Sequence, residues 1–290
     1  MVVYVSPVPG VSLRPYTPAD RAAVLELVNA DRLPGQPAAT PAMLADAVRG
    51  RSRVDAGWWA ELACPTTTVA TSAAGTVLGV VSYALRPKDG HGVILWLHCR
   101  EDESVARALL DRAGTELGTR TLDAFHFATA LTLGVEALPA GHRPATHAAL
   151  TAAGYTGVDL WRYMHRTLPA PELPRLTRYD TEPATPDTRR LLVTEDGKTL
   201  ADATIGTPVQ GTGVVWWIGV QPAARGQGTG RALLGTALHA LSRMGAADVI
   251  LFVDDAPPGG DRDRTAAKAL YESSGFEEID RLYSFTKQSR

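Results

Sequence analysis

Glycines alternate with polar residues in the segment 225–230, between an apolar run and a helical pattern. The run Val214 to Val220 predicts a buried strand, Pro222 ends it, and a helix is expected from about Arg231. Backbone N–H groups in such a turn point at one spot, where the helix dipole favours negative charge. Glycine has no Cβ, so this backbone can approach a ligand closely. The segment therefore predicts a phosphate-binding loop.

The glycine spacing excludes two common kinds of phosphate loop. The segment lacks the Gly-Lys-Ser/Thr ending that a nucleoside-triphosphate loop uses for its phosphates and magnesium. Its glycines run G-Q-G-T-G, which is not the G-x-G-x-x-G spacing of a dinucleotide loop. Glycines that only permit tight packing of strand against helix remain the alternative interpretation.

A second pattern follows about 45 residues downstream. Four residues spaced i, i+3, i+4 and i+7 share one helix face: Ala267, Leu270, Tyr271 and Ser274. Gly275 is expected to end this helix in the left-handed conformation. Between the two patterns, the continuous apolar run 249–253 is typical of a fully buried central strand. Strand, loop, helix, strand and helix therefore follow in a fixed order.

These segments together resemble the GNAT N-acetyltransferase superfamily. The family pattern Q/R-x-x-G-x-G/A matches residues 225–230, the preceding V-x-P matches 220–222, and A-x-x-L-Y-x-x-x-G-F matches 267–276. The resemblance implies an α/β (α+β) fold with a mixed, mostly antiparallel central sheet flanked by helices. It also implies acetyl-CoA as the acyl donor and direct attack by a primary amine.

The resemblance assigns roles to individual residues. Acetyl-CoA binding is expected at the strand end, the loop and the first helical turn: Ile218, Gly219, Val220, Arg225, Gly226, Gln227, Gly228, Thr229, Gly230 and Arg231. Backbone N–H groups of 218–220 are expected to stabilise the oxyanion. Tyr271 matches the general acid, because a phenol is still protonated at neutral pH. A core tyrosine bonded to backbone is the alternative. Arg264 replaces the family's usual asparagine seven residues before Tyr271.

The first half of the chain repeats the plan of the second. The strand 93–97 matches 214–218 at an offset of 121 positions, and Gly154 matches Gly275 at the same offset. In place of the loop the first copy has Cys99-Arg-Glu-Asp-Glu, with three carboxylates and no glycine. Leu150 stands where Tyr271 is expected. The first copy is therefore expected to have lost its cofactor chemistry.

The repeat predicts two tandem domains. Residues 1–168 are expected to form a degenerate GNAT-like domain without a phosphate loop, and 173–290 a GNAT domain with the acyl-CoA loop. The proline-rich joint 168–174 is a stiff spacer. The second half has little room for the two helices that usually wall the acceptor site, so the first half is expected to supply part of that wall.

The base and the acceptor pocket have several candidates. Asp254, Asp255, Asp202 and Glu195 could each accept the proton of the amine, and no base at all is a further alternative. Trp216 and Trp217 point to opposite faces of a strand. Because Trp217 matches Trp96 in the repeat, Trp217 is expected in the core. Trp216 and Asp254 are then expected to line the pocket of a cationic amine.

Composition bounds the function. A net charge of −2 gives no sign of general affinity for nucleic acid or an anionic membrane. Cys64 and Cys99 are too few for a disulfide framework, and neither has a metal ligand at a usable spacing. No apolar run reaches membrane-spanning length, and the first residues show no secretion signal, so a cytoplasmic protein is expected.

The predicted function is acetyl-CoA-dependent N-acetylation of a primary amine by the second half of the chain, with a small-molecule amine as the expected acceptor. The acceptor class is open: a small metabolite, an aminoglycoside-like compound, an amino-sugar conjugate or a protein N-terminus. The alternative is a non-catalytic acyl-CoA-binding sensor or interaction protein, which would keep the loop but would not need Tyr271. A tRNA-dependent aminoacyl transferase of the same doubled fold is disfavoured by the intact loop and the slightly negative charge.

Overall fold

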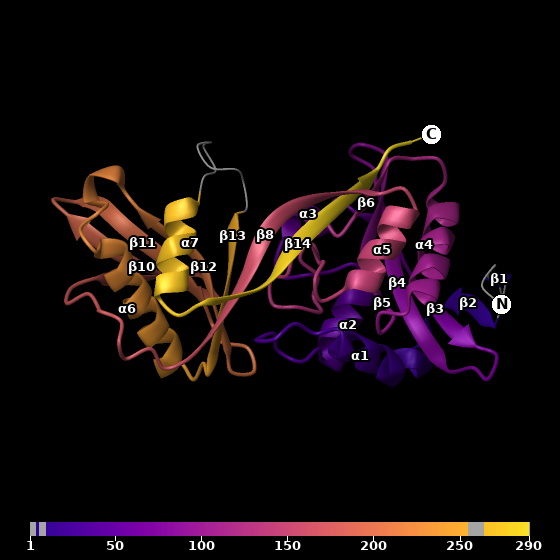
Figure 1. Cartoon of the computed structure of the whole chain (residues 1–290), viewed down its shortest axis with the longest axis horizontal. Helices are drawn as coiled ribbons and strands as arrows, with labels where there is room; N and C mark the ends of the chain where they lie inside the picture. Colours follow the sequence, from indigo (N-terminus) through magenta and orange to yellow (C-terminus); the bar gives the residue numbers. More distant parts are fainter. Residues whose placement is uncertain (1–3, 6–9, 255–263, 290) are drawn as a thin grey trace. The chain divides into compact units, whose positions relative to one another are not determined.

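The protein was analysed as a computed structural model that describes residues 4–5, 10–254 and 264–289 (Figure 1). The chain divides into two compact units. Unit 1 comprises the described residues of Met1–Leu33, Ala38–Leu160 and Asp280–Arg290, and unit 2 comprises those of Pro34–Pro37 and Trp161–Ile279. No helix within the described ranges is both long and apolar enough to cross a membrane.

The sheet of unit 1 has the strand order β1-β2-β3-β4-β5-β6-β14, and β8 follows β14. The strands from the first half of the chain are β1 (Tyr4–Val5), β2 (Val11–Pro15), β3 (Ala63–Ser72), β4 (Val77–Arg86), β5 (His91–His98), β6 (Leu122–Ala124), β7 (Leu138–Pro139) and β8 (Thr156–Thr167). Pairing is antiparallel except between β5 and β6, which run parallel. The expected apolar run 93–97 lies in β5 and is fully buried.

Helices cover both faces of the sheet in unit 1. They are α1 (Arg21–Ala30), α2 (Pro41–Val48), α3 (Ala56–Trp59), α4 (Glu103–Leu117) and α5 (Pro144–Ala152), with a 3₁₀ turn, η1, at Pro18–Asp20. On one face, Val28 of α1 and Leu44 of α2 belong to a core cluster with Trp96 of β5. On the other face, Leu109 of α4 and Leu150 of α5 form a second cluster. Trp96 is therefore enclosed.

Unit 2 has the strand order β8-β13-β12-β11-β10-β9. Its further elements are β9 (Asp180–Thr185), β10 (Thr188–Glu195), β11 (Lys198–Gly206), β12 (Thr212–Val220), η2 (Pro222–Ala224), α6 (Thr229–Arg243), β13 (Asp248–Asp254), α7 (Thr265–Ser273) and β14 (Glu277–Lys287). Only β12 and β13 pair in parallel, across the α6 crossover. The two units thus repeat one arrangement, and the expected fold class, a mostly antiparallel sheet flanked by helices in each half, is confirmed.

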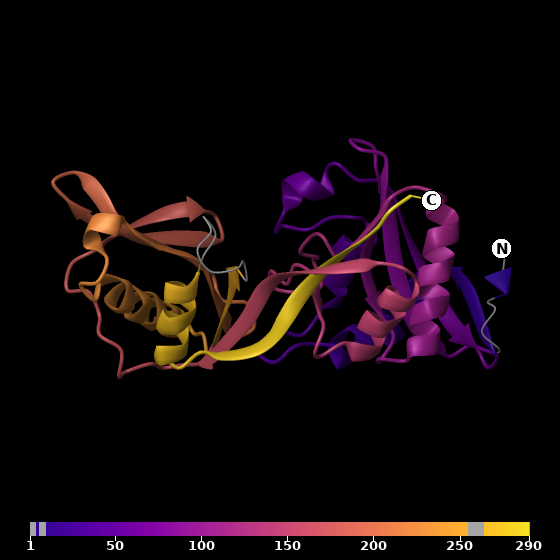
Figure 2. The same cartoon turned by 45° about the horizontal axis from the view of Figure 1, so that its top comes forward.

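In the described part of unit 2, the helices α6 and α7 cover one face of the sheet. Leu233 and Leu238 of α6 and Tyr271 of α7 pack with Leu251 of β13 in one core cluster, and Figure 2 shows α6 and α7 on the same side of the strands. The opposite face has no counterpart of α1 and α2, because residues 168–211, all of them described, form strands β9–β11 and no helix.

A short segment from the first half of the chain lies on that opposite face. The Tyr163 hydroxyl donates a hydrogen bond to the Pro34 carbonyl oxygen at 2.8 Å, and the Thr212 hydroxyl donates one to the Gly35 carbonyl oxygen at 2.9 Å. The amide of Gln36 donates to the Tyr163 oxygen at 3.3 Å. Pro34–Pro37 of the first half therefore cover part of this face, but they do not line the cavity of unit 2, and a contribution of the first half to the acceptor wall remains a prediction.

Two long strands, β8 and β14, belong partly to each unit (Figures 1 and 2). Residues 161–167 of β8 pair with β13 in unit 2, whereas 282–287 of β14 pair with β6 and β7 in unit 1. The domain limits expected from the sequence, 1–168 and 173–290, remain a prediction. The compact units have other limits because each half of the chain completes its sheet with a strand from the other half.

Candidate active site

Strands β12 and β13 separate part-way along their length. Their parallel pairing joins residues 212–215 to residues 248–251. On the other side of β12 the register with β11 shifts, so that Trp216 is the extra residue of a β-bulge. Within the described pairings, the edge of β12 that faces β13 is therefore unpaired from Trp216 to Val220. Backbone N–H groups on that edge are available to a ligand.

The loop between β12 and α6 is held open by two glycines. Gly226 and Gly228 have φ of 75° and 81°. Any L-residue that has a side chain is strained in this region, and glycine is not. A Cβ built on either glycine would meet no atom within 4 Å, so the space above them is open. Gly228 precedes α6 and offers no side chain to cap its N–H groups. The first turn of α6 therefore keeps backbone N–H groups that Gly228 does not cap, as the predicted phosphate-binding loop requires.

Three polar side chains of the loop and the first helical turn make hydrogen bonds to different parts of unit 2. The Arg225 Nε donates a hydrogen bond to the Val220 carbonyl oxygen at 3.0 Å, which holds the guanidinium beside the strand end. The amide of Gln227 bonds to the Ala223 carbonyl oxygen at 3.3 Å. Arg231 bonds at 3.1 Å to Ser273 of α7. Arg231 therefore ties α6 to α7.

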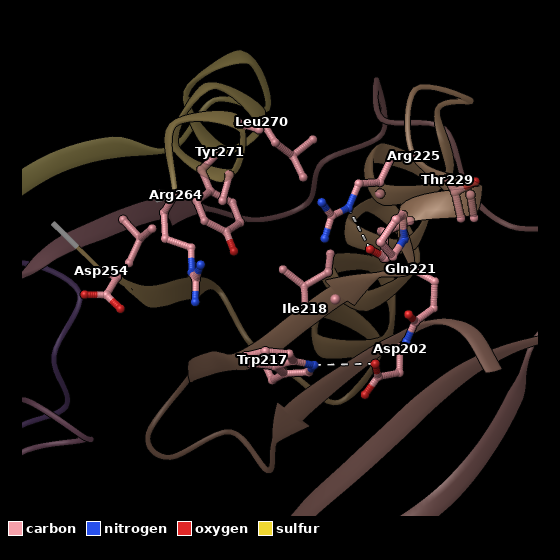
Figure 3. A pocket seen from close by; sticks show the side chains of 18 of the residues that line it. Asp202, Trp217, Ile218, Gln221, Arg225, Thr229, Asp254, Arg264, Leu270 and Tyr271 are labelled. Carbon is pink, nitrogen blue, oxygen red and sulfur yellow. Dashed lines mark hydrogen bonds between the residues drawn. The ribbon is translucent and has the colours of Figure 1, made fainter. Parts of the chain in front are cut away.

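A cavity of about 730 Å³ lies between the loop, β12, the end of β13 and α7, all of them in unit 2 (Figure 3). The expected acyl-donor residues that line it are Ile218, Gly219, Val220, Arg225, Gly226, Gly228, Thr229 and Gly230. The expected acid Tyr271 and the expected acceptor residues Trp216 and Asp254 line it as well. Gln227 and Arg231 are not part of the lining, so the structure does not bring these two together with the rest.

Tyr271 is buried in α7, and its hydroxyl points into the cavity toward Ile218 (Figure 3). Its ring packs edge-on against Phe276, with 5.9 Å between the ring centroids. The hydroxyl makes no hydrogen bond with any residue that the structure describes, which does not fit a core tyrosine bonded to backbone. Burial raises the pKa of Tyr271 to about 12, against a smaller opposite effect of the Arg264 charge. The phenol therefore keeps its proton at neutral pH.

Gly219 lies on the separated part of β12 beside an indole ring. A Cβ at this position would lie 3.0 Å from Nε1 and 3.2–3.3 Å from two carbons of Trp217. A side chain at this position would therefore force the Trp217 ring to shift by a few tenths of an ångström. Both this close packing and a close approach to a ligand are compatible with the place of Gly219 in the cavity lining.

The candidate bases fall into different surroundings. Asp254 is buried at the end of β13 and lines the cavity. Asp202 of β11 also lines it, but its carboxylate accepts hydrogen bonds from Arg190 Nε at 3.0 Å and from Trp217 Nε1 at 3.5 Å. Glu195 is exposed at the end of β10 and is not in the lining. Asp255 lies outside the described residues. Asp254 is thus the candidate with the least exposure to water.

The expectation that Trp217 is a core residue is wrong. Trp217 is 54% exposed, whereas its counterpart Trp96 in unit 1 is 2% exposed. The reason is a difference between the units: α1 and α2 cover Trp96, whereas the described residues of unit 2 form no helix on the corresponding face. Trp216 is half-buried and stacks on Phe252 with 6.4 Å between ring centroids and an interplanar angle of 18°. Both tryptophans line the cavity.

Sequence reasoning did not single out part of the cavity lining. Trp161 of β8 comes from a strand without a recognisable local pattern. Phe252 belongs to the apolar run 249–253, which predicted a buried strand and not a place in the site; the pairing of β8 with β13 brings the two residues together. Arg264 precedes α7 and its guanidinium points into the cavity (Figure 3). For Arg264 a signal was present, since it replaces the usual asparagine of the resembled family.

Unit 1 has the same bulged strand but a closed helix start. The register of β5 with β4 shifts at Leu95, which matches Trp216 in the repeat. The carboxylate of Asp102 accepts hydrogen bonds from the backbone N–H groups of Ser104 at 2.9 Å and Val105 at 3.1 Å. The Ser104 hydroxyl and these N–H groups lower the pKa of Asp102. The Asp102 carboxylate thus caps the start of α4, whereas Gly228, the N-cap residue of α6, has no side chain.

The sequence of the second half matches a known domain family. Residues 187–278 match the Acetyltransferase (GNAT) domain. The mycothiol acetyltransferase of Beutenbergia cavernae is 40% identical over 84 residues, 29% of this chain and 26% of the relative. That of Kocuria rhizophila is 41% identical over 73 residues, 24% of this chain and 22% of the relative. The chain thus matches about a quarter of the length of these relatives.

Solved structures share the fold over nearly the whole chain. A tandem GNAT protein from the clavulanic acid biosynthesis pathway has a TM-score of 0.64 at 16% identity, covering 97% of this chain and 99% of that one. A GCN5-related N-acetyltransferase from Sphaerobacter thermophilus has a TM-score of 0.62 at 15% identity, covering 97% and 96%. At such identities the likeness shows the fold, including its doubled arrangement.

Proposed function

We propose that the chain is a tandem GNAT protein whose second half, matched to the acetyltransferase domain at residues 187–278, transfers an acetyl group from acetyl-CoA to the primary amine of a small molecule. The observation that carries the proposal is the cavity of unit 2, which joins an uncapped helix start, an unpaired strand edge and a buried phenol. The relatives named mycothiol acetyltransferases support acetyl transfer as the reaction.

The residues of the cavity fit acetyl-CoA. The pyrophosphate needs N–H donors and positive potential, and the start of α6 supplies both beside Arg225. The open space above Gly226 and Gly228 leaves room for phosphate oxygens next to the backbone. The unpaired edge of β12 from Trp216 to Val220 would hold the amide groups of the donor as an added strand would. When bound, acetyl-CoA supplies an acyl thioester.

Three groups of the protein then act in the reaction: backbone N–H groups of β12, the Asp254 carboxylate and the Tyr271 hydroxyl. Backbone N–H groups of 218–220 donate hydrogen bonds to the carbonyl oxygen, where negative charge develops; one such donor is commonly worth about 10²- to 10³-fold in rate. Asp254 takes the proton that the ammonium group loses before attack. A C–N bond forms, the C–S bond breaks, and the Tyr271 hydroxyl donates a hydrogen bond to the departing sulfur as negative charge develops there. The released thiolate takes its proton from solvent.

Calorimetry and turnover with matched glycine variants test this proposal. We expect one acetyl-CoA site per chain and release of free thiol when small primary amines are added. Gly228→Ala places a side chain at φ 81° in the loop, so the N–H groups move and acetyl-CoA affinity falls about tenfold. Gly245→Ala is the control, because Gly245 has φ 90°, equally open surroundings and a place outside the cavity.

The two measurements separate the alternatives. Equal loss of affinity in Gly228→Ala and Gly245→Ala would assign the effect to general strain and not to the loop. Binding of acetyl-CoA at one site without thiol release, for any amine of a broad panel, would contradict the proposed catalysis and leave a non-catalytic acyl-CoA-binding protein. Two binding sites would contradict the assignment of activity to the second half alone.

A further inference from the structure

Trp217 is exposed at the wall of the cavity, where a large apolar side chain in water is unfavourable. It lies on the sheet face opposite α6 and α7, because its strand neighbours Ile218 and Val220 pack with the helix-side cluster. Its counterpart in unit 1 is enclosed. A single exposed tryptophan needs no explanation by itself. Its place beside the proposed reaction centre is the first of two observations.

The second observation is that the exposed ring is held in one orientation. The Trp217 ring lies against the backbone at Gly219, where no Cβ could fit without displacing it. Its Nε1 donates a hydrogen bond to Asp202 Oδ1 at 3.5 Å, the dashed line in Figure 3. Asp202 Oδ2 in turn accepts from Arg190 Nε at 3.0 Å. These contacts favour one orientation of the ring, and a ring that is already oriented loses less conformational entropy when a ligand binds.

The residues around the Trp217 ring indicate which kind of ligand would bind there. Trp216, stacked on Phe252, continues the aromatic surface along the same cavity, and Trp161 comes from β8. Aromatic faces attract cations as well as flat apolar surfaces. The buried carboxylate of Asp254 lines the same cavity and favours an ammonium group. An amine that also carries a ring would satisfy both features.

We propose that Trp217 is the stacking platform for the acceptor, and that the acceptor is a primary amine attached to a ring, either an aromatic ring or a sugar ring with an apolar face. This inference rests on the proposed function and names the substrate class of that site. Gly219 and Asp202 act as positioning residues for the platform.

Paired ring and open-chain amines test the platform. The aromatic pair is phenethylamine and hexylamine, and the sugar pair is glucosamine and its open-chain amino-alditol. Trp217→Ala should raise KM for one of the ring amines by about 3- to 10-fold and leave KM for hexylamine and acetyl-CoA unchanged. Trp217→Phe should restore most of the KM. Trp58→Ala, at a 51% exposed tryptophan of unit 1, should change nothing.

Asp202 has its own test. Asp202→Ala removes the acceptor of the Trp217 hydrogen bond, so KM for the ring amine should rise while kcat stays the same. Asp202→Asn keeps an oxygen acceptor and should recover the KM. A loss of kcat in both variants, at unchanged KM, would assign Asp202 to proton transfer and overturn its positioning role.

Binding of the same amines, followed by saturation-transfer NMR, separates this inference from the proposed function. If no amine is acetylated but a ring amine binds to the wild type and not to Trp217→Ala, the platform stands and the proposed catalysis fails. If turnover occurs with equal KM in wild type and Trp217→Ala, the catalysis stands and the platform is overturned. Failure of both ring amines to bind the wild type also overturns it. The pair in which Trp217→Ala raises KM for the ring amine but not for the open-chain amine shows whether the acceptor ring is aromatic or a sugar.

Discussion

At the scale of single residues, the proposed chemistry depends most on Tyr271. Its hydroxyl lies in a cavity, is bonded to no described residue, and belongs to a phenol with a pKa of about 12. A free thiol has a pKa near 8.5, below that of this phenol, so full proton transfer to a free thiolate would be uphill; the Tyr271 hydroxyl acts by hydrogen bonding to the sulfur as negative charge develops there during C–S cleavage. The raised pKa keeps that proton in place through the neutral range.

Replacing Tyr271 by phenylalanine should lower kcat about 10²-fold with KM for acetyl-CoA little changed, because the lost contact acts mainly in the transition state. Steady-state kinetics on purified protein measure both constants. The ring packing on Phe276 is kept by the variant, so folding should be unaffected. Tyr179→Phe, at an exposed tyrosine outside the cavity, is the matched control. An unchanged kcat in Tyr271→Phe would remove Tyr271 from the role of acid.

At the scale of elements, the two halves differ in the residue that precedes the helix after the bulged strand, α4 in unit 1 and α6 in unit 2. Both α4 and α6 follow a bulged strand that has a parallel neighbour. Asp102 fills the N-terminus of α4 with a carboxylate of the chain, which satisfies two N–H groups and repels a second anion. Gly228 leaves the N-terminus of α6 without such a group. The residue at the cap thus separates the capped start of α4 from the start of α6, which we propose as the phosphate site.

Asp102→Ala should destabilise the protein by about 1 kcal/mol, because α4 loses its N-cap. The pKa of Asp102 is lowered in the folded state, so this stabilisation is present above the unfolded pKa near 3.8 and is lost as pH falls through the lower folded value. Urea titrations of wild type and variant at pH 7 and pH 3 measure it. The difference should shrink at pH 3; a constant difference would show that the charge contributes nothing.

At the scale of the whole molecule, neither half of the chain completes its own sheet. Residues 161–167 of β8 precede the joint yet pair with β13 of unit 2, opposite Asp248–Asp254. Residues at the end of β14 pair with β6 and β7 of unit 1. A strand that loses its partner exposes a row of N–H and C=O groups and the apolar residues beneath it. The halves are therefore expected to fold together.

The fragment 173–290 should accordingly be unfolded and unable to bind acetyl-CoA, although it contains the whole loop and Tyr271. Circular dichroism melting and calorimetry compare it with the full chain. Producing 1–172 and 173–290 together should restore a complex that melts cooperatively and binds one acetyl-CoA, since all strand pairs can then form. Cooperative melting and full affinity of 173–290 alone would contradict the exchange of strands.

The sequence by itself determined the doubled fold and the location of the loop. Positive φ at Gly226, Gly228 and Gly275 was foreseeable, since each ends or begins a helix where a side chain would be strained. The burial of Tyr271 followed from its helical spacing with Ala267. These features depend on residues close together in the chain, for which local sterics and hydrophobic periodicity decide the conformation.

Only the tertiary structure decided which residues surround the loop. Trp217 was misplaced because its burial depends on a helix layer that unit 1 has and the described part of unit 2 lacks, not on its own strand. Trp161 reaches the cavity because β8 crosses into unit 2, and Arg231 leaves it because Ser273 of another helix binds its guanidinium. Contacts of this kind join residues far apart in the sequence. The free energy of these contacts depends on how whole helices and strands pack together, and a local sequence pattern does not predict that packing.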